Sequence, residues 1–204
     1  MLIIGAGFGG ICMGIKAKAA GLSVLILERA EDIGGTWREN VYPGCACDTQ
    51  SHHYSFSFFM KSNWSRRFAG HAEILEYLHS AVDAFDLQGN IRLQQAVQSI
   101  HFSQDTSIWS VKTESGATYR ARFVVSAVGQ LNQPAWPDIP DFTTFSGKLM
   151  HSATWDTSYD LSGKTVAVIG NGASAVQLIP EVAKKAKHLT VFQRSPNWIV
   201  ERND

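Results

Sequence analysis

Cysteine, net charge and long apolar runs are all scarce in this 204-residue sequence, and each shortage excludes a class of protein. Three cysteines are too few, and odd in number, for a disulfide framework, so we expect free thiols and a cytoplasmic location. Eighteen Lys and Arg balance eighteen Asp and Glu, so the charge gives no indication of a nucleic-acid partner. No apolar run approaches the roughly 18 residues of a membrane span, so we expect a soluble chain.

One short segment contains several residues of the types that bind zinc: Cys45, Cys47, His52 and His53. A C-x-C pair followed by two adjacent histidines matches no common structural-zinc spacing. We therefore expect these four side chains to be loop and pocket-wall residues, and we predict no metal site.

The most informative feature that is present is an internal repeat. Residues 4–10, IGAGFGG, recur as residues 169–175, IGNGASA, and the alignment continues without a gap. In each copy the glycine motif follows a short apolar segment and precedes a segment with helical character. The predicted strand, helix and strand span residues 2–4, 8–20 and 22–27 in the first copy and residues 165–169, 173–187 and 189–192 in the second. The sequence therefore predicts two copies of one βαβ unit.

Between the copies, residues 32–68 are loop-rich and aromatic, and apolar residues at helical spacing then extend from Ile74 to Phe85. The strands predicted next are one that enters the main sheet, a β-meander and a final buried strand, at residues 91–93, 97–102, 108–113 and 117–128. Three prolines within residues 131–141 predict a stiff connector and a domain boundary.

The two glycine motifs have the pattern of dinucleotide sites, in which N–H groups at the start of a helix bind a pyrophosphate. Glu28 ends the second strand of the first copy, where a carboxylate accepts hydrogen bonds from a ribose diol and repels a 2′-phosphate, which indicates FAD or NAD. The equivalent residue in the second copy is Gln193, followed by Arg194 and Ser195, which indicates NADP. Arg29 aligns with Arg194, so both copies have an arginine at this position. The absence of a carboxylate in the second copy is therefore the change that distinguishes the two predicted nucleotides.

These patterns together predict an α/β fold with two domains. Residues 1–140 are expected to form the N-terminal part of a Rossmann-like FAD-binding domain with a β-meander. Residues 141–204 are expected to form a linker and the first βαβ unit of a second Rossmann-like domain, which binds NADP.

Further segments resemble the flavin-dependent Baeyer-Villiger monooxygenases. They are Gly5 to Gly10 with Glu28, Gly34-Gly35-Thr36-Trp37, Tyr42-Pro43-Gly44 through Asp48, Tyr54 to Phe58, and Phe145 to Asp156. The last segment matches the family's F-x-G-x-x-x-H-x-x-x-W-[P/D] fingerprint at every fixed position. The resemblance implies an FAD- and NADPH-dependent enzyme that inserts one oxygen atom from O2 next to a ketone carbonyl, which gives an ester or lactone.

The resemblance also implies roles for individual residues. Asp48 is expected to be the catalytic residue of this chain, paired with an arginine that lies beyond its last residue, and His151 and Trp155 are expected to couple the domains. The expected cofactor-binding residues are Gly5, Gly7, Phe8, Gly9, Glu28, Arg29, Thr36, Trp37, Asp48, Tyr54 and Val97 for FAD, and Ala46, Cys47, Asp48, Gly170, Gly172, Ala173, Ser174, Gln177, Arg194 and Ser195 for NADPH.

Alternatives to this interpretation stay open. Asp48 in a glycine- and cysteine-rich loop could cap a turn, and His151 alone would more often be a satisfied polar residue. The aromatic residues Phe56, Phe58, Phe59, Trp64 and Phe68 are expected to pack around the flavin and not to form a substrate box. The chain is expected to be a fragment of a longer enzyme; an N- or S-oxygenating flavoprotein and an inactive flavin- or nucleotide-binding module are the other two hypotheses.

Overall fold

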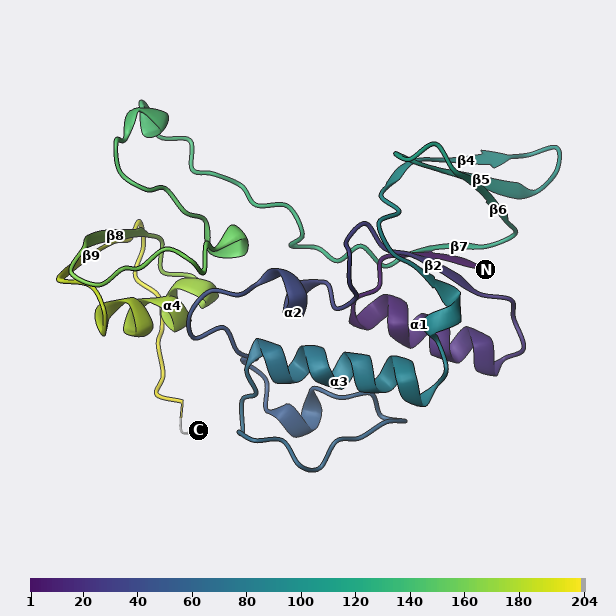
Figure 1. Ribbon diagram of the computed structural model, residues 1–204, viewed down its shortest axis with the longest axis horizontal. Helices are drawn as coiled ribbons and strands as arrows, with labels where there is room; N and C mark the ends of the chain where they lie inside the picture. Colours follow the sequence, from purple (N-terminus) through teal and green to yellow (C-terminus); the bar gives the residue numbers. More distant parts are fainter. Residues whose placement is uncertain (203–204) are drawn as a thin grey trace. The chain divides into compact units, whose positions relative to one another are not determined.

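The computed structural model describes residues 1–202 and divides the chain into two compact units (Figure 1). The first unit contains Met1–Arg38, Phe56–Phe59 and Ile74–Asn132. The second contains Glu39–Ser55, Met60–Glu73 and Gln133–Asp204. Our predicted domains, 1–140 and 141–204, stay a prediction, and the last two residues of the second lie outside the described residues.

A parallel four-stranded sheet forms the centre of the first unit. Its strand order is β3 (Ile91–Arg92), β2 (Leu25–Leu27), β1 (Leu2–Ile4) and β7 (Val124–Ser126). The residues of β1 are buried without alternation, as expected for a central strand covered on both faces. Helix α1 (Phe8–Ala19) connects β1 to β2, which completes the first predicted βαβ unit.

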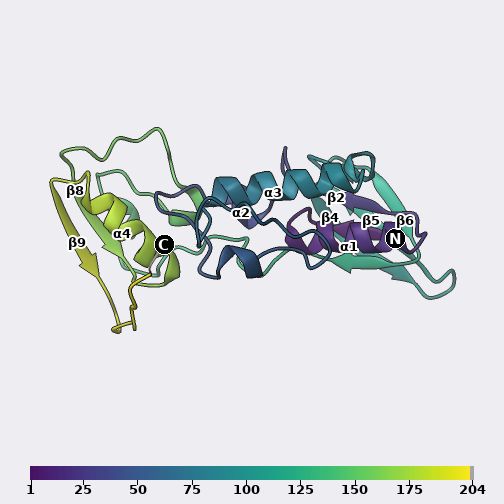
Figure 2. The same cartoon turned by 90° about the horizontal axis from the view of Figure 1, so that it is seen from below.

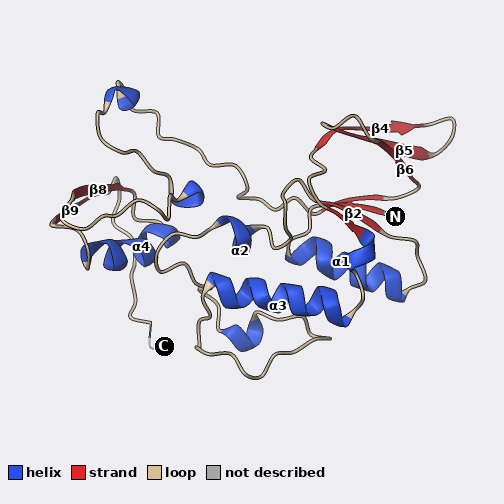
Figure 3. Ribbon diagram, in the orientation of Figure 1, coloured by secondary structure: helices blue, strands red, loops and turns tan. Residues whose placement is uncertain are grey.

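Helix α3 (His71–Ala84) lies beside α1, and its Tyr77 ring stacks on Phe8 of α1 at 6.0 Å between ring centroids (Figures 1 and 3). The 3.6-residue pattern predicted this helix, and its buried face consists of Ile74, Tyr77, Leu78, Ala81 and Val82. The buried face of α3 therefore includes Tyr77 and Ala81, which the apolar pattern did not include.

The β-meander consists of the antiparallel strands β4 (Val97–Ser103), β5 (Ile108–Thr113) and β6 (Thr118–Ala121). The prediction of one strand over residues 117–128 was wrong, because β6 pairs with β5 whereas β7 pairs with β1 in the other sheet. The chain leaves the meander after Ala121, and the N–H of Leu2 donates to the carbonyl of Phe123 at 2.9 Å. This residue pair marks where the chain changes sheets.

The second unit contains the other βαβ unit, formed by β8 (Thr165–Ile169), α4 (Ala173–Ala183) and β9 (His188–Phe192) (Figure 2). Helix α4 ends earlier than the predicted Lys187, because the N–H groups of Lys185 and Ala186 both donate to the carbonyl of Val182 and Lys187 donates to Lys164. A buried cluster joins α4 to two other segments of this unit and consists of Tyr42, Cys45, Leu161, Leu178 and Val182.

The remaining short elements are α2 (Thr36–Glu39), η1 (Ser51–His53), η2 (Gln88–Asn90), η3 (Phe142–Thr144) and η4 (Ser152–Thr154). Most of residues 127–164 is drawn as loop between β7 and β8 (Figure 3). No helix within residues 1–202 is long and apolar enough to cross a membrane.

Candidate functional site

The first glycine motif forms a tight turn between β1 and α1. Gly5 has a φ of +100°, and a Cβ atom there would lie 2.6 Å from the carbonyl oxygen of Ala127. A Cβ atom at Gly10 would overlap the carbonyl oxygen of Gly5. Gly7 is the N-cap of α1 and has no side chain that could accept from the first N–H groups of the helix, so the start of this helix is open to an external anion.

Glu28 is connected directly to this turn. Its side chain is buried, at 6% exposure, and Oε2 accepts from the N–H of Ala6 at 2.7 Å while Oε1 accepts from the N–H of Ala30 at 3.0 Å. Each carboxylate oxygen keeps a further lone pair. The carboxylate therefore lies at the glycine turn with acceptor capacity for the hydroxyls of a ribose.

Several of the other residues predicted for FAD belong to the same unit. The N–H of Gly34 donates to the carbonyl of Ala6 at 2.9 Å, which brings the start of α2, with exposed Thr36 and buried Trp37, next to the glycine turn. Arg29 is exposed, and its guanidinium donates to the carbonyl of Asn132 at 3.3 Å. Val97 is half-buried at the start of β4. The fold thus brings Thr36 and Trp37 to the glycine turn.

Tyr77 is a residue of this region that the sequence analysis missed. It is buried, at 1% exposure, and its hydroxyl accepts from the N–H of Phe56 at 2.7 Å and donates to the carbonyl of Phe59 at 2.8 Å. Phe8 packs edge-on against Phe56 with ring centroids 5.1 Å apart. The helical spacing of Tyr77 with Ile74 and Leu78 was the available signal, and it indicates burial but not the two hydrogen bonds.

The predicted aromatic cluster divides between the two units. Phe56, Phe58 and Phe59 lie in the first unit with Phe8 and Tyr77, whereas Trp64 and Phe68 lie in the second. Tyr54 also lies in the second unit, and its N–H donates to the carbonyl of Ser51 at 3.0 Å.

The second glycine motif repeats the backbone of the first. Gly170 has a φ of +108°, and its N–H donates to Phe192 at 2.8 Å, as the N–H of Gly5 donates to Leu27 at 2.8 Å. Gly172 is the N-cap of α4, again without a side-chain capping bond, and Ala173 and Ser174 follow in the first turn. The start of α4 is therefore open in the same way as that of α1.

The residues beyond β9 are held near the second glycine turn by Asn171. Its side-chain amide donates to Oε1 of Gln193 at 3.0 Å and to the carbonyl of Ser195 at 2.8 Å. Arg194 and Ser195 are both exposed, and no carboxylate stands at the position equivalent to Glu28. This arrangement presents a guanidinium and a hydroxyl, which suit a 2′-phosphate.

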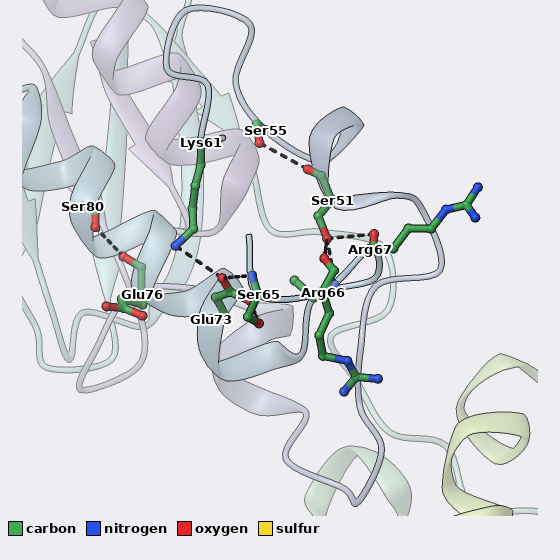
Figure 4. Close-up of polar contacts among 10 residues, drawn as sticks. Ser51, Ser55, Lys61, Ser65, Arg66, Arg67, Glu73, Glu76 and Ser80 are labelled. Carbon is green, nitrogen blue, oxygen red and sulfur yellow. Dashed lines mark hydrogen bonds and ion pairs between the residues drawn. The ribbon is translucent and has the colours of Figure 1, made fainter. Parts of the chain in front are cut away.

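The loop that carries Asp48 is fixed on two sides. Ala46 forms an isolated antiparallel bridge with Gly70, and the N–H of Cys47 donates to Ala69 at 2.9 Å. Ser51 strengthens this pairing, because its buried hydroxyl accepts from the N–H of Ala69 at 2.8 Å and contacts the carbonyls of Arg66 and Arg67 (Figure 4). Asp48 itself is exposed.

On its other side, this loop contacts α4 through Gln177. Oε1 of Gln177 accepts from the hydroxyl of Tyr42 at 2.9 Å and from the N–H of Ala46 at 3.3 Å, and Nε2 donates to the carbonyl of Ala46 at 2.8 Å. The sequence predicted Gln177 as a nucleotide ligand, and this stays a prediction. The contact of Gln177 with Tyr42 was missed, because nothing local in the sequence links residues so far apart.

The same loop contains two buried thiols. Burial raises the pKa of Cys45 and that of Cys47.

The fingerprint segment is held by its own contacts. Nδ1 of His151 accepts from the N–H of Ala153 at 3.1 Å, and the His151 ring lies edge-on to Trp136 at 5.4 Å. Trp155 packs against the buried cluster around Tyr42. Nζ of Lys148 lies 2.7 Å from Oδ2 of Asp156, and this hydrogen bond lowers the pKa of Asp156 to about 2.

Metal ligands do not gather in the part of the chain that the structure describes: no group of three or more His, Cys, Asp or Glu side chains there could hold a metal ion. All three cysteines are free thiols.

Comparisons with known proteins agree with these observations. The family profile described as "Pyridine nucleotide-disulphide oxidoreductase" matches residues 2–204. A Baeyer-Villiger monooxygenase of Streptomyces coelicolor is 45% identical over 203 residues, which cover 99% of this chain and 39% of that protein.

Two solved structures have the same fold over nearly the whole chain. The open crystal structure of cyclohexanone monooxygenase has a TM-score of 0.92 and 41% identity, and covers 98% of this chain and 40% of that one. The crystal structure of an OTEMO complex with FAD and NADP has a TM-score of 0.90 and 39% identity. The match covers 97% of this chain and 39% of that one. The chain thus spans about two fifths of the length of these relatives.

Proposed function

The chain belongs to the pyridine nucleotide-disulphide oxidoreductase family, and we propose that it is part of an FAD- and NADPH-dependent Baeyer-Villiger monooxygenase. Such an enzyme inserts one oxygen atom from O2 next to the carbonyl of a small-molecule ketone and forms an ester or lactone. The observation that carries the proposal is the pair of glycine turns. Their backbones are alike, but the carboxylate of Glu28 lies at the first and the guanidinium-bearing residue Arg194 follows the second strand of the other.

The first glycine turn fits FAD. A helix N-terminus without a side-chain cap, the close approach of Gly5 to Ala127 and the acceptor capacity of Glu28 suit the pyrophosphate and ribose of an adenine dinucleotide. When bound, FAD supplies the redox chemistry and the activation of O2. The residues that would hold it are Gly5, Gly7, Phe8, Gly9, Glu28, Arg29, Thr36, Trp37, Tyr54 and Val97.

The second glycine turn fits NADPH, because Arg194 and Ser195 can bind a 2′-phosphate and no acid repels it. The residues that would hold NADPH are Gly170, Gly172, Ala173, Ser174, Gln177, Arg194 and Ser195. Ala46 and Cys47 would face the nicotinamide, in the loop whose exposed end carries Asp48.

Asp48 is the proposed catalytic residue of this chain. Its carboxylate is exposed on a loop that hydrogen bonds fix on both sides, so it can be held at a set position next to bound nucleotide. His151 and Trp155 are proposed to couple the two domains; Trp155 packs on the cluster that contains Tyr42. Free thiols favour a cytoplasmic location.

Visible absorption of the purified chain tests the proposal. The chain is incubated with FAD, desalted, and then treated anaerobically with NADPH or NADH. We expect retained flavin that NADPH bleaches faster than NADH. In the longer enzyme of which the chain is proposed to be part, we expect an ester or lactone when a ketone and O2 are added. An N-oxide or S-oxide from a heteroatom substrate, with no ester from any ketone, would favour an N- or S-oxygenating enzyme. Retained flavin that neither nucleotide bleaches would favour a nucleotide-binding module.

A further inference from the structure

The side-chain amide of Gln177 lies on the first turns of α4, five residues after the N-cap Gly172. It makes three hydrogen bonds to the loop before Asp48: from the hydroxyl of Tyr42 at 2.9 Å, from the N–H of Ala46 at 3.3 Å and to the carbonyl of Ala46 at 2.8 Å. Both ends of the amide are therefore engaged with one loop. The equivalent residue in the first copy, five residues after Gly7, is Cys12, which carries no amide.

Tyr42 belongs to the same contact. It is 7% exposed, and burial raises its pKa to about 12, so the hydroxyl that donates to Gln177 stays neutral. Ser174, in the first turn of α4, is one of the residues proposed to bind the nucleotide.

The backbone of the loop also lies directly on α4. A Cβ atom at Gly44, where φ is +80°, would lie 2.5 Å from the carbonyl oxygen of Gln177. On the far side, Cys47 is held by Ala69 and by Arg202, whose guanidinium donates to the Cys47 carbonyl at 3.1 Å. The loop from Tyr42 to Cys47 is therefore placed between α4 and the segment around Ala69, and Asp48 follows it at the surface.

We propose that Tyr42 and Gln177 are positioning residues that link nucleotide occupancy at the start of α4 to the conformation of the loop that carries Asp48. The inference rests on the proposed function, because it needs a nucleotide at the second glycine turn. A nucleotide there contacts the first turn of α4, and the change reaches the loop through Gln177, Tyr42 and the backbone of Ala46. Coupling of this kind is reciprocal, so the position of the loop also changes nucleotide affinity.

A thiol of the loop gives a readout that does not depend on catalysis. In a Cys12→Ser, Cys47→Ser background the remaining cysteine, Cys45, is buried in this loop and is not among the residues proposed to face the nicotinamide, so its alkylation rate reports opening of the loop. We expect NADP+ to slow alkylation by about fivefold or more, within the usual range of coupling between sites. Gln177→Met and Tyr42→Phe remove the polar link and keep similar volume, and we expect each to reduce this protection to less than about twofold.

NADP+ affinity is measured in parallel by equilibrium dialysis, so that loss of binding and loss of coupling are told apart. Gln104→Met, on the exposed turn after β4, is the matched control and should keep full protection. If Gln177→Met does not fold cooperatively, Tyr42→Phe decides the result. Full protection in a variant that still binds NADP+ would overturn the inference and leave the proposed function intact. A parent protein that binds no NADP+ would overturn the proposed function, and the inference with it.

Discussion

The two glycine turns have the same backbone but different surroundings. Gly5 and Gly170 both take φ values near +100°, and both turns lead into a helix with an open N-terminus. At the first turn a buried carboxylate binds the N–H of Ala6, whereas at the second the amide of Asn171 binds Gln193. The comparison indicates that the glycine turn is common to both units, and that the residue at the end of the second strand, Glu28 or Gln193, is the difference on which the proposed choice between FAD and NADPH rests.

The packing around the two turns also differs. A Cβ atom at Gly10 would overlap the carbonyl of Gly5, but the equivalent position in the second copy holds Ala175. A Cβ atom at Gly170 would meet nothing within 4 Å. The first turn is thus closely packed against its helix and against Ala127, the residue after β7, and the second leaves more space.

The largest expected effect comes from Gly10→Ala, which gives the first turn the residue of the second. We expect a loss of about 3 kcal/mol in the free energy of unfolding, because the new methyl group overlaps a backbone carbonyl that cannot move freely. Denaturant unfolding measures the loss, and FAD retention after desalting should fall with it. The reverse change, Ala175→Gly, is the control and should cost less than about 1 kcal/mol. Equal losses from the two changes would contradict the difference in packing.

Glu28→Gln tests the charged side of the comparison. The amide keeps the shape of the carboxylate, but its NH2 group would face either the N–H of Ala6 or that of Ala30, so one buried donor loses its acceptor at a cost of about 1–3 kcal/mol. We expect the Kd for FAD to rise about tenfold or more, measured by flavin fluorescence titration. A Kd unchanged by Glu28→Gln would show that the carboxylate contributes structure but no ligand contact.

The sequence predicted the βαβ repeat and the place of Glu28 after the second strand, because both are local patterns: a glycine turn, and an acid a fixed distance after it. The role of Glu28 as a ribose ligand stays a prediction. It could not predict that residues 39–55 and 60–73 pack in the second unit, because that depends on pairing between Ala46 and Gly70 and on contacts with α4. The same holds for the bond from Tyr42 to Gln177, whose residues are separated by 135 positions. For a similar reason residues 117–128 were predicted as one strand, since their apolar pattern carries no sign of the change of sheet after Ala121.

Arg194→Ala tests the second turn. Removing a guanidinium that is proposed to bind the 2′-phosphate should raise the Kd for NADP+ about tenfold, the effect of one charge-assisted hydrogen bond, and leave the Kd for NAD+ unchanged. Arg29→Ala is the matched control, because Arg29 stands at the equivalent position of the first copy. Equilibrium dialysis with both nucleotides measures these values. A parallel loss of NAD+ binding in Arg194→Ala would mean that the arginine does not select the phosphate.

The smallest effect is expected in the fingerprint segment, which has no counterpart in the first unit. The hydrogen bond from Lys148, with others from Ser158, lowers the pKa of Asp156 from 3.8 to about 2. Since the pKa is lower in the folded state, the carboxylate stabilises the fold above about pH 4, and this contribution is lost as the pH falls through about 2. Asp156→Asn should therefore flatten the dependence of Tm on pH between these values, whereas Asp105→Asn, on the exposed turn after β4, should not. The side chain of Asp156 is 33% exposed and solvent screens the pair, so the change in Tm should be small. If Asp156→Asn and the parent gave the same profile, the bond to Lys148 would not persist in solution, and the segment would depend on Trp155 and its packing against the Tyr42 cluster.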